Sequence, residues 1–461
     1  MSKKLRNLII ALAVLLVLGG SYYGSIAWKR KKTEAAAPAP NMPLPRLGNL
    51  ESSKLTKIEI PDIVLEKRDN SWELSSLRGG PPPGGIALDQ NQIQSISYSL
   101  ASIYIDRIAD ENPEDLSVYG LKEPAVRALI TDSDGNKAEY LLGDMTPSRT
   151  SYYVMEKGKP GVHIISSYAA ENMQFNLDKI RQKSLFPAFE FTAFEELHIQ
   201  NGERRIEISL RPESVPPYLD SSFSSHIITS PYKLPRGVDG EALENLIAPL
   251  QNLAVTDFID DSPSSLQPYG LDKPVRIILT TSDNSLDLMI GNKLDGKHYA
   301  KLADAPGVFT LSGMESLINV KPFNLIDKFA LLINIDKVDH LSVIGGEKPL
   351  SADFQKNEDE GIYFLNGEKA ETKSFKQWYQ AVIGLLSDAE YPGPVRKSED
   401  SGTGNIRIEY QLNTPPGERV SITLVPYNRD FYALQQEGTM EFLISRTQVR
   451  RIYETADAVI F

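Results

Sequence analysis

The stretch Tyr119-Gly120-Leu121-Lys122-Glu123-Pro124 returns 150 positions later as Tyr269-Gly270-Leu271-Asp272-Lys273-Pro274. Upstream, the pair Ile105-Asp106 matches Ile259-Asp260 in the same order. Each copy is followed by an apolar run, a turn and a second apolar run. A recurrence with a fixed period and a fixed internal order predicts a duplicated structural unit.

The residue types of this motif have a packing explanation. Glycine adopts a positive φ that other residues resist, and proline fixes its own φ while biasing its predecessor toward extended backbone. A tyrosine can bury its ring and keep its hydroxyl at the rim of a core. We interpret the motif as a turn that leads back onto a sheet, with a ligand-binding role as the alternative. The residues assigned to this structural motif are Tyr119, Gly120, Leu121, Pro124, Tyr269, Gly270, Leu271 and Pro274.

Around the motif, short alternating apolar runs and one amphipathic segment recur in the same order. Leu88 to Ile103 has helical spacing in the first unit, and Gly240 to Leu253 takes its place in the second. Tyr232-Lys233-Leu234 stands where Trp72-Glu73-Leu74 stood and is predicted to be a strand. The pattern predicts an α+β fold of tandem repeats, each mainly antiparallel sheet plus helix, preceded by a single transmembrane helix.

A third, diverged unit closes the chain. Tyr363-Phe364-Leu365 fills the aromatic strand, and the motif is reduced to Tyr391-Pro392-Gly393-Pro394. Two units followed by an unrelated tail is the alternative. The predicted segments are an anchor with basic flanks (1–32), an Ala/Pro-rich linker (33–50), repeat 1 (51–190), repeat 2 (191–335) and a diverged repeat 3 (336–461).

The N-terminus carries an uncharged segment from Leu8 through Leu18 to Trp28. As a helix these 21 residues would be about 31 Å long, which matches a hydrocarbon core of about 30 Å. We expect a retained single-pass anchor in the cytoplasmic (inner) membrane, with the bulk of the chain periplasmic. A cleaved signal peptide is the alternative, because Ser25-Ile26-Ala27 offers small residues at a peptidase spacing.

The charge is distributed unevenly. Residues 1–32 hold seven basic residues and no acidic ones, and the remainder has 42 basic against 61 acidic residues, a balance of −19. Such an acidic body repels polyanions, so nucleic acid is not an expected partner. Cysteine is absent, which excludes thiol nucleophiles and cysteine metal sites.

Catalytic motifs are not evident, so we predict no catalytic residue, no cofactor and no metal. The five histidines, His163, His198, His226, His298 and His340, do not form a His-Glu-x-x-His pattern. Asp132 to Asn136 resembles part of a calcium loop, but a hairpin turn explains it better. Asp260-Asp261 could act as paired carboxylates, although a solvated loop is the simpler interpretation. The recurring arginines Arg127, Arg276 and Arg407 are interpreted as strand-edge charges that block edge pairing, with anion binding as the alternative.

With the repeat in view, the chain resembles the bacterial family known as domain of unknown function 4340. The resemblance rests on the N-terminal anchor, the tandem units, the two motif copies, and the Phe-Asn-Leu…Asp-Lys junctions at Phe175 and Phe323. Such proteins are often associated with gliding-motility-type ABC transport systems, beside an auxiliary membrane protein. The resemblance therefore implies an accessory or scaffold role and supplies no catalytic residues.

The expected function is that of a non-enzymatic, membrane-anchored accessory or scaffold subunit of a bacterial envelope complex, an ABC-type transport system. The alternative is an extracytoplasmic binding module for cell-wall glycan or another envelope ligand, for which Trp72, Tyr232 and Tyr363 would supply exposed aromatic platforms. The matched strand positions of these three residues favour the core instead. A hydrolase is a third hypothesis, and it requires a cluster of His, Asp and Ser that the sequence does not show.

Overall fold

The computed structural model describes residues 46–356, 361–393, 404–413 and 417–461. The predicted anchor, with Leu8, Leu18 and Trp28, and most of the predicted linker lie outside these residues. In the part of the chain that the structure describes, no helix is both long and apolar enough to span a bilayer.

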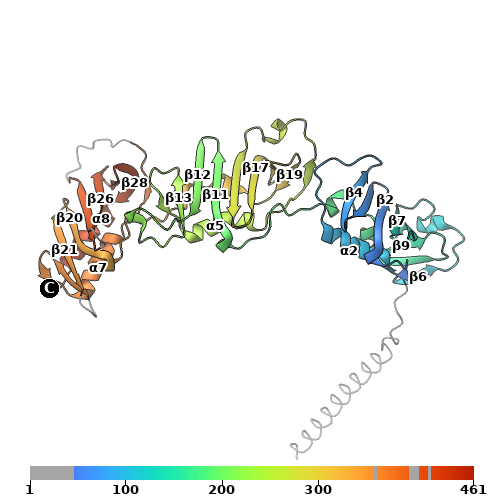
Figure 1. Ribbon diagram of the computed structural model, residues 1–461, viewed down its shortest axis with the longest axis horizontal. Helices are drawn as coiled ribbons and strands as arrows, with labels where there is room; N and C mark the ends of the chain where they lie inside the picture. The colour runs from blue at the N-terminus through green and yellow to red at the C-terminus, as the bar shows by residue number, and fades with distance from the viewer. Residues whose placement is uncertain (1–45, 357–360, 394–403, 414–416) are drawn as a thin grey trace, which may run out of the picture. The chain divides into compact units, whose positions relative to one another are not determined.

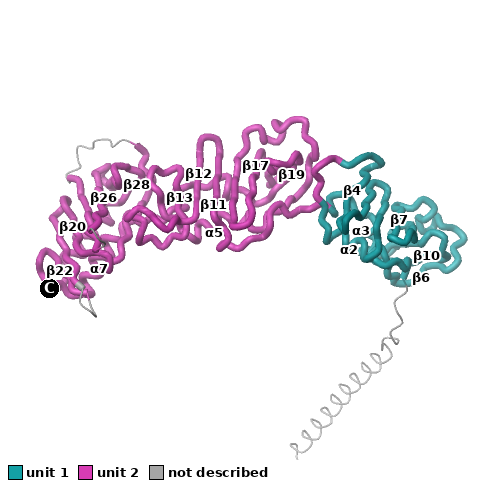
Figure 2. The backbone as a smooth tube through the Cα atoms, in the orientation of Figure 1, with its two compact units in different colours: residues 1–82, 88–180 teal, residues 83–87, 181–461 magenta. Residues whose placement is uncertain are grey.

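The chain folds into two compact units (Figure 2). In the described part, unit 1 comprises residues 46–82 and 88–180, and unit 2 comprises residues 83–87 and 181–461. Unit 1 contains one large sheet and its own core, whereas unit 2 contains two large sheets that share one continuous hydrophobic core.

Sheet 1 has eight antiparallel strands in the order β4-β3-β2-β7-β8-β9-β10-β6 (Figure 1). Its strands are β2 (Leu55–Ile60), β3 (Ile63–Arg68), β4 (Ser71–Leu77), β6 (Arg107–Asp110), β7 (Val126–Asp132), β8 (Lys137–Met145), β9 (Ser151–Glu156) and β10 (Val162–Ser166). Unit 1 also contains the short pair β1 (Arg46–Leu47) and β5 (Ile103–Tyr104), and the helices α2 (Gln90–Ala101), α3 (Ser167–Met173) and α4 (Leu177–Ile180).

Sheet 2 has nine strands in the order β14-β13-β12-β11-β16-β17-β18-β19-β15. They are β11 (Phe194–Asn201), β12 (Arg204–Leu210), β13 (His226–Ser230), β14 (Arg236–Gly237), β15 (Phe258–Asp260), β16 (Val275–Thr281), β17 (Ser285–Leu294), β18 (Lys297–Leu302) and β19 (Val308–Leu311). Its helices are α5 (Gly240–Gln251) and α6 (Glu315–Ile318).

Sheet 3 repeats the same order as β23-β22-β21-β20-β25-β26-β27-β28-β24. Its strands are β20 (Val338–Ile344), β21 (Leu350–Lys356), β22 (Gly361–Leu365), β23 (Glu368–Lys369), β24 (Ala389–Glu390), β25 (Ile406–Leu412), β26 (Arg419–Pro426), β27 (Phe431–Gln436) and β28 (Thr439–Ser445). Its helices are α7 (Thr372–Ile383) and α8 (Arg446–Asp457). The expected repeat of antiparallel sheet plus helix is therefore confirmed, and the last segment has the same architecture as the first two.

Local chemistry explains why the main helix of each sheet starts where it does. Asp89, Asp239 and Glu371 precede α2, α5 and α7, and each carboxylate accepts a hydrogen bond from a backbone N–H in the first turn. Such a cap satisfies a donor that the helix leaves unpaired. The apolar stripe of each helix then faces its sheet, with Ile93, Ile96 and Leu100 fully buried on α2.

Two strand predictions are wrong. Tyr232-Lys233-Leu234 forms bends after β13 because Pro231 and Pro235 flank it and supply no N–H to a ladder. Arg127, Arg276 and Arg407 lie on β7, β16 and β25, which are central strands and not edges. Arg276 instead holds Asp287 of the neighbouring strand through two hydrogen bonds of 2.9 and 2.5 Å on the solvent face.

The fold also includes residues that the sequence assigned to the linker. Leu47, on β1, is 5% exposed and lies in the core of unit 1. A short 3₁₀ turn then precedes the opening strand of each sheet, at Ser52–Lys54, Phe191–Ala193 and Ile335–Lys337. Residues 46–50 therefore belong to the repeat, because their apolar side chains complete its core.

Candidate interaction surfaces

The motif forms the same turn in both copies. Gly120 and Gly270 follow a 3₁₀ turn with φ of 67° and 69°, the left-handed region that favours glycine. Leu121 and Leu271 then donate backbone hydrogen bonds to Leu116 and Leu266. The turn is thus closed by its own backbone, and Pro124 and Pro274 lie half-buried just before β7 and β16.

A second glycine accommodates each turn. A Cβ placed at Gly143 on β8 would lie 2.1 Å from the carbonyl oxygen of Tyr119, and one at Gly291 on β17 would lie 2.1 Å from that of Tyr269. Leu121 is 2% exposed beside Gly143. The turn therefore packs directly on the sheet backbone, an approach that requires glycine.

The tyrosines of the motif bridge to the edge strand of their sheets. The hydroxyl of Tyr119 donates to Asp110 at 2.9 Å, and that of Tyr269 donates to Asp260 at 3.0 Å. Each of these hydrogen bonds raises the pKa of its phenol, because the carboxylate favours the protonated form. In both copies the bonded aspartate lies nine residues before the tyrosine. The residue that matches Asp260 is therefore Asp110, and the match to Asp106 made from the sequence is wrong.

The third unit does not place the motif where its residue types suggested. The backbone N–H of Tyr391 donates to Glu441, so Tyr391 continues the edge strand β24. In sheets 1 and 2 the motif follows the edge strand, β6 or β15, after an intervening loop. In the third repeat the corresponding stretch falls in residues 394–403, which lie outside the described part. Tyr391 is therefore not the counterpart of Tyr119.

The polar residues considered for chemistry are dispersed over separate elements. Asp260 accepts from Tyr269, whereas Asp261 forms an ion pair with Arg181 at 2.6 Å, so the two carboxylates serve different partners. Asp132 accepts from the backbone N–H groups of Asp134 and Asn136 and closes the β7–β8 hairpin. No group of three potential metal ligands occurs in residues 46–461 outside the undescribed gaps.

The histidines are likewise separate. His340 bonds Asp353 at 2.8 Å, and His198 lies 3.6 Å from Glu196. His163, His226 and His298 are at least partly buried, and burial lowers the pKa of each.

The three aromatics that motivated glycan binding are not exposed. Trp72, Tyr232 and Tyr363 are 3%, 8% and 6% accessible and belong to the hydrophobic cores. Trp72 lies on β4 and Tyr363 on β22, whereas Tyr232 follows β13 and its ring centroid lies 5.2 Å from that of Phe442 on sheet 3. Their burial agrees with the interpretation that they belong to the core, and it contradicts the exposed platforms that the glycan alternative requires.

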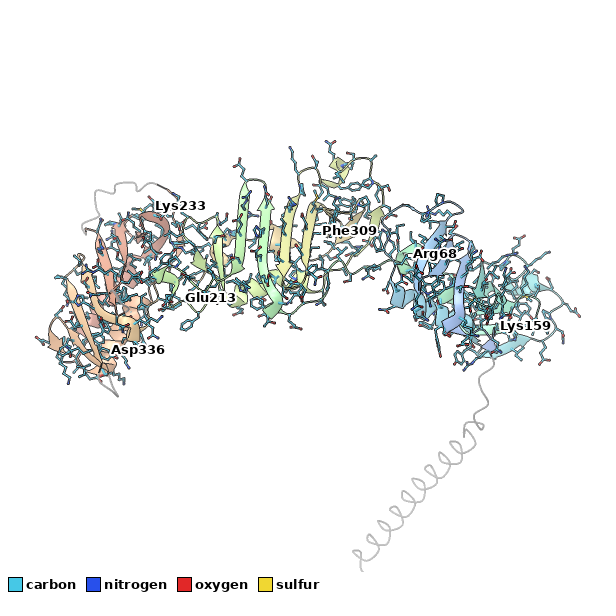
Figure 3. All side chains as sticks on the ribbon, viewed as in Figure 1. Arg68, Lys159, Glu213, Lys233, Phe309 and Asp336 are labelled. Atoms are coloured by element: carbon cyan, nitrogen blue, oxygen red, sulfur yellow. The ribbon has the colours of Figure 1, made fainter. Side chains whose placement is uncertain are left out.

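A buried polar cluster joins sheets 2 and 3 within unit 2. The guanidinium of Arg236 on β14 donates to Gln436 at 2.5 Å and to Glu441 at 3.2 Å, and it lies over the ring of Phe442. The hydroxyl of Tyr232 donates to Glu390 at 2.8 Å. Lys233, labelled in Figure 3, donates its backbone N–H to Glu441 at 2.5 Å.

This contact is one of two equivalent junctions in unit 2. At the first junction, segments 83–87 and 181–185 lie on the β15/β19 edge of sheet 2, where Phe309 is labelled in Figure 3. At the second, segments 231–237 and 326–330 lie on the β24/β28 edge of sheet 3. The same backbone hydrogen bonds recur at both: Val255–Lys183 and Leu185–Leu253 at the first junction (2.8 and 2.9 Å), and Ser387–Lys328 and Ala330–Leu385 at the second (both 2.8 Å).

An apolar groove of about 650 Å³ opens beside the second junction. It lies between the β12–β13 connection, the segment before β20 and helix α7. Phe223 at its wall is 93% exposed, and Ile335 and Ile383 line it. Lys337 and Asp220 form an ion pair at the same groove. A large exposed aromatic beside an apolar groove is typical of a binding surface.

Sequence reasoning missed the junctions and the groove. The available signals were weak: three consecutive prolines at 81–83, and Pro231 and Pro235 on either side of Tyr232-Lys233-Leu234. Prolines mark a loop but do not say which sheet the loop will cover.

The comparisons with known proteins give one match. The sequence model of the family described as a domain of unknown function, DUF4340, matches residues 80–220 and 227–393. These two segments cover more than half of the chain. No curated protein matches, and no solved structure matches.

Proposed function

The chain belongs to the DUF4340 family, as its sequence resemblance indicated, and on that premise we propose that it is a non-enzymatic, membrane-anchored accessory or scaffold subunit of a bacterial envelope complex. The complex we propose is an ABC-type transport system of the gliding-motility kind, with its transporter subunits or an auxiliary membrane protein as partners. Energy coupling would reside in those partners.

The membrane attachment in this proposal rests on the sequence. The uncharged segment from Leu8 to Trp28, with its basic flanks, would span the inner membrane once. Residues 33–45, rich in alanine and proline, would hold the folded body away from the bilayer on the periplasmic side.

The observation that carries the interaction role is the groove beside the second junction. Phe223 is almost fully exposed, and leaving such a ring in water is unfavourable by about 1.5–3 kcal/mol compared with burying it. The walls of the groove come from parts of sheets 2 and 3 that share one core. Such a surface is pre-formed, so a partner that covers it loses little entropy in ordering it.

The polar residues of unit 2 also support a structural role over a catalytic one. Asp260 and Asp261 are each held by a separate partner, and His340 is held by Asp353. A general base requires reach to a substrate proton in addition to a suitable pKa.

Affinity purification of the tagged full chain from membranes tests the proposal. We expect the transporter subunits to co-purify with it, and to be lost when residues 50–330 are deleted while residues 1–32 are kept. The Phe223→Asp variant should reduce their recovery, because it places a charge at the groove. Tyr98→Asp is the matched control, since Tyr98 is also exposed, at 65%, but lies on α2 of unit 1. Undiminished recovery with the deletion variant would reject the proposed function.

The groove also favours the second candidate function in one form. Its volume falls in the range of about 300–1,000 Å³ that small-ligand sites occupy, and its lining is mostly apolar. An apolar envelope ligand therefore fits better than a glycan. Native mass spectrometry of the purified body, with Phe223→Asp as control, would reveal a retained lipid-like molecule. A body that carries none after gentle extraction would count against this candidate.

A further inference from the structure

Two walls of the groove beside the second junction run antiparallel to each other. One wall is the segment 330–337, which leads into β20, and the other is helix α7. The backbone N–H of Ala330 donates to the carbonyl oxygen of Leu385, just beyond α7, at 2.8 Å. The hydroxyl of Tyr379 donates to the carbonyl oxygen of Ile333 at 2.9 Å. The residue numbers therefore rise along one wall while they fall along the other.

The third wall, the β12–β13 connection, is aligned with the segment 330–337 in the same way. Asp220 forms an ion pair with Lys337, and the hydroxyl of Ser221 accepts a hydrogen bond from the backbone N–H of Asn334 at 3.4 Å. Phe223 comes two residues later on this wall. Its exposed ring therefore lies toward the end of the groove that is away from Lys337.

The groove thus has two chemically different ends. The antiparallel alignment places Lys337 and Lys376 at one end, and Leu332, Ile383 and Phe223 toward the other. A ligand with one charged end and one apolar end therefore has a single favourable orientation in the groove, because only one of the two ends offers it charged side chains.

The charged end carries a cation without a counter-charge. Lys337 is paired with Asp220, whereas Lys376 takes part in none of the ion pairs between residues that the structure describes. The ammonium of Lys376 lies 5.9 Å from the ring centroid of Tyr363. Asp336, labelled in Figure 3, acts on the same tyrosine, because its charge adds to burial in raising the pKa of Tyr363, but it does not line the groove. The lining holds two lysines and one aspartate, so this end favours an anion.

An acyl chain with an anionic head group matches this lining. The chain would displace water from the apolar end, which is favourable in proportion to the apolar area covered. The head group would supply the counter-charge of Lys376. An extended peptide fits less well, because its backbone N–H and C=O groups would face apolar side chains that cannot satisfy them.

We propose that the groove binds an acyl chain with an anionic head group, with the chain against Phe223, Leu332 and Ile383 and the head group at Lys376. This inference rests on the second candidate function and adds the charge of the ligand and its orientation. A free fatty acid and an anionic phospholipid share this chemistry, so the experiment includes both.

Photolabelling of the full chain in phosphatidylcholine nanodiscs tests the inference. The probes are palmitate with a diazirine near its methyl end, palmitate with a diazirine near its carboxyl end, and phosphatidylglycerol with a diazirine on one acyl chain. We expect the methyl-end probe to label peptides that contain Phe223, Leu332 or Ile383, and the carboxyl-end probe to label peptides around Lys376. Labelling by palmitate alone would identify a free fatty acid as the ligand, and labelling by phosphatidylglycerol alone would identify a membrane lipid.

Substitutions on α7 separate the charge from the apolar contact. Lys376→Met should raise the palmitate concentration for half-maximal labelling by about tenfold, because a hydrogen bond between charged groups is lost. It should leave labelling by the matching fatty alcohol unchanged, since that probe has no charge. Lys373→Met is the matched control, because Lys373 is exposed one turn earlier on α7 and does not line the groove. Both lysines are exposed, so both variants should keep the wild-type melting temperature.

Two results would overturn the inference: equal labelling of Lys376→Met and wild type by palmitate, or the same labelled peptides with the methyl-end and carboxyl-end probes. In either case labelling that is lost in Phe223→Asp would still support the second candidate function with an uncharged ligand. If no probe labels the wild type more than Phe223→Asp, both the inference and the second candidate function fail. Co-purification of the transporter tests the accessory role separately.

Discussion

The guanidinium of Arg236 on sheet 2 and the carboxylate of Glu441 on sheet 3 form an ion pair at 3.2 Å, with side chains only 8% and 10% exposed. A pair this deeply placed costs desolvation that its attraction offsets only with further hydrogen bonds. Gln436 and the backbone of Lys233 supply those bonds. The cluster thereby fixes how sheets 2 and 3 meet within unit 2.

Removing one member of this pair should be costly. We expect Arg236→Met to destabilise unit 2 by about 3–5 kcal/mol, because Glu441 is left buried without its counter-charge. The double variant Arg236→Met/Glu441→Leu should recover much of that loss. Urea unfolding followed by circular dichroism measures both. Arg276→Met is the control, since its pair with Asp287 is exposed and should be worth less than about 1 kcal/mol. Equal costs for the two arginines would contradict this account.

The close approach of the motif to the sheet predicts a steric effect. Gly291→Ala should destabilise unit 2 by about 1–3 kcal/mol, because the added methyl group would overlap the carbonyl of Tyr269. Gly240→Ala is the matched control, as a Cβ there meets nothing within 4 Å at the start of α5. That control should be neutral or slightly stabilising through helix propensity. Thermal unfolding of both variants measures these effects. If Gly291→Ala does not lower the stability, the turn can move away from the sheet.

The core position of Leu47 gives a test of where repeat 1 begins. Leu47→Ala should cost about 2–5 kcal/mol, as expected for a buried leucine, whereas a residue in a mere spacer would cost nothing. The exposed neighbour Asn49 provides the control as Asn49→Ala. Chemical denaturation of residues 33–461, with unit 1 followed by hydrogen exchange, would report the loss. If Leu47→Ala leaves the stability of unit 1 unchanged, residues 46–50 belong to the linker and not to the repeat.

Buried His226 predicts acid sensitivity. Burial lowers its pKa in the folded state, so the neutral ring is favoured there relative to the unfolded chain. Its contribution is complete above the unfolded pKa of about 6.5 and declines as the pH falls through that value toward the lower folded pKa. The His226→Phe variant removes this titration, and the adjacent rings of Phe191 and Phe194 can accept an aromatic side chain.

The measurement is the unfolding midpoint of each protein at pH 7.5 and pH 5.5. We expect the wild type to lose more stability between these values than His226→Phe, with the remaining loss attributable to His163 and His298, whose pKa values are also lowered by burial. His340→Phe is the control, because His340 is partly exposed beside Asp353. If His226→Phe loses as much stability between the two pH values as the wild type and His340→Phe do, the buried His226 does not cause the acid sensitivity.

The local features were predictable because each depends on neighbours in the sequence. The spacing of Ile93, Ile96 and Leu100 identified α2, and the matched motif at Tyr119 and Tyr269 identified the repeat. The match of Asp106 to Asp260 was wrong by four residues, because Asp110 is the residue that bonds the tyrosine, and side-chain pairing within a loop leaves no periodic pattern in the sequence. The contacts of Tyr232 with Glu390 and Phe442 were also missed, because they join residues more than 150 positions apart in the sequence.

The sequence by itself determined the period of the repeat, its mix of strands and helices, and the family to which the chain belongs, because these follow from residue spacing and order. Only the tertiary structure decided that β7, β16 and β25 are central strands, and that segments 83–87 and 181–185 cover the edge of sheet 2. Those outcomes depend on contacts between residues far apart in the chain, such as Arg181 with Asp261 and Arg236 with Glu441. Long-range pairing is set by which surfaces bury each other, and no local pattern encodes the identity of the partner surface.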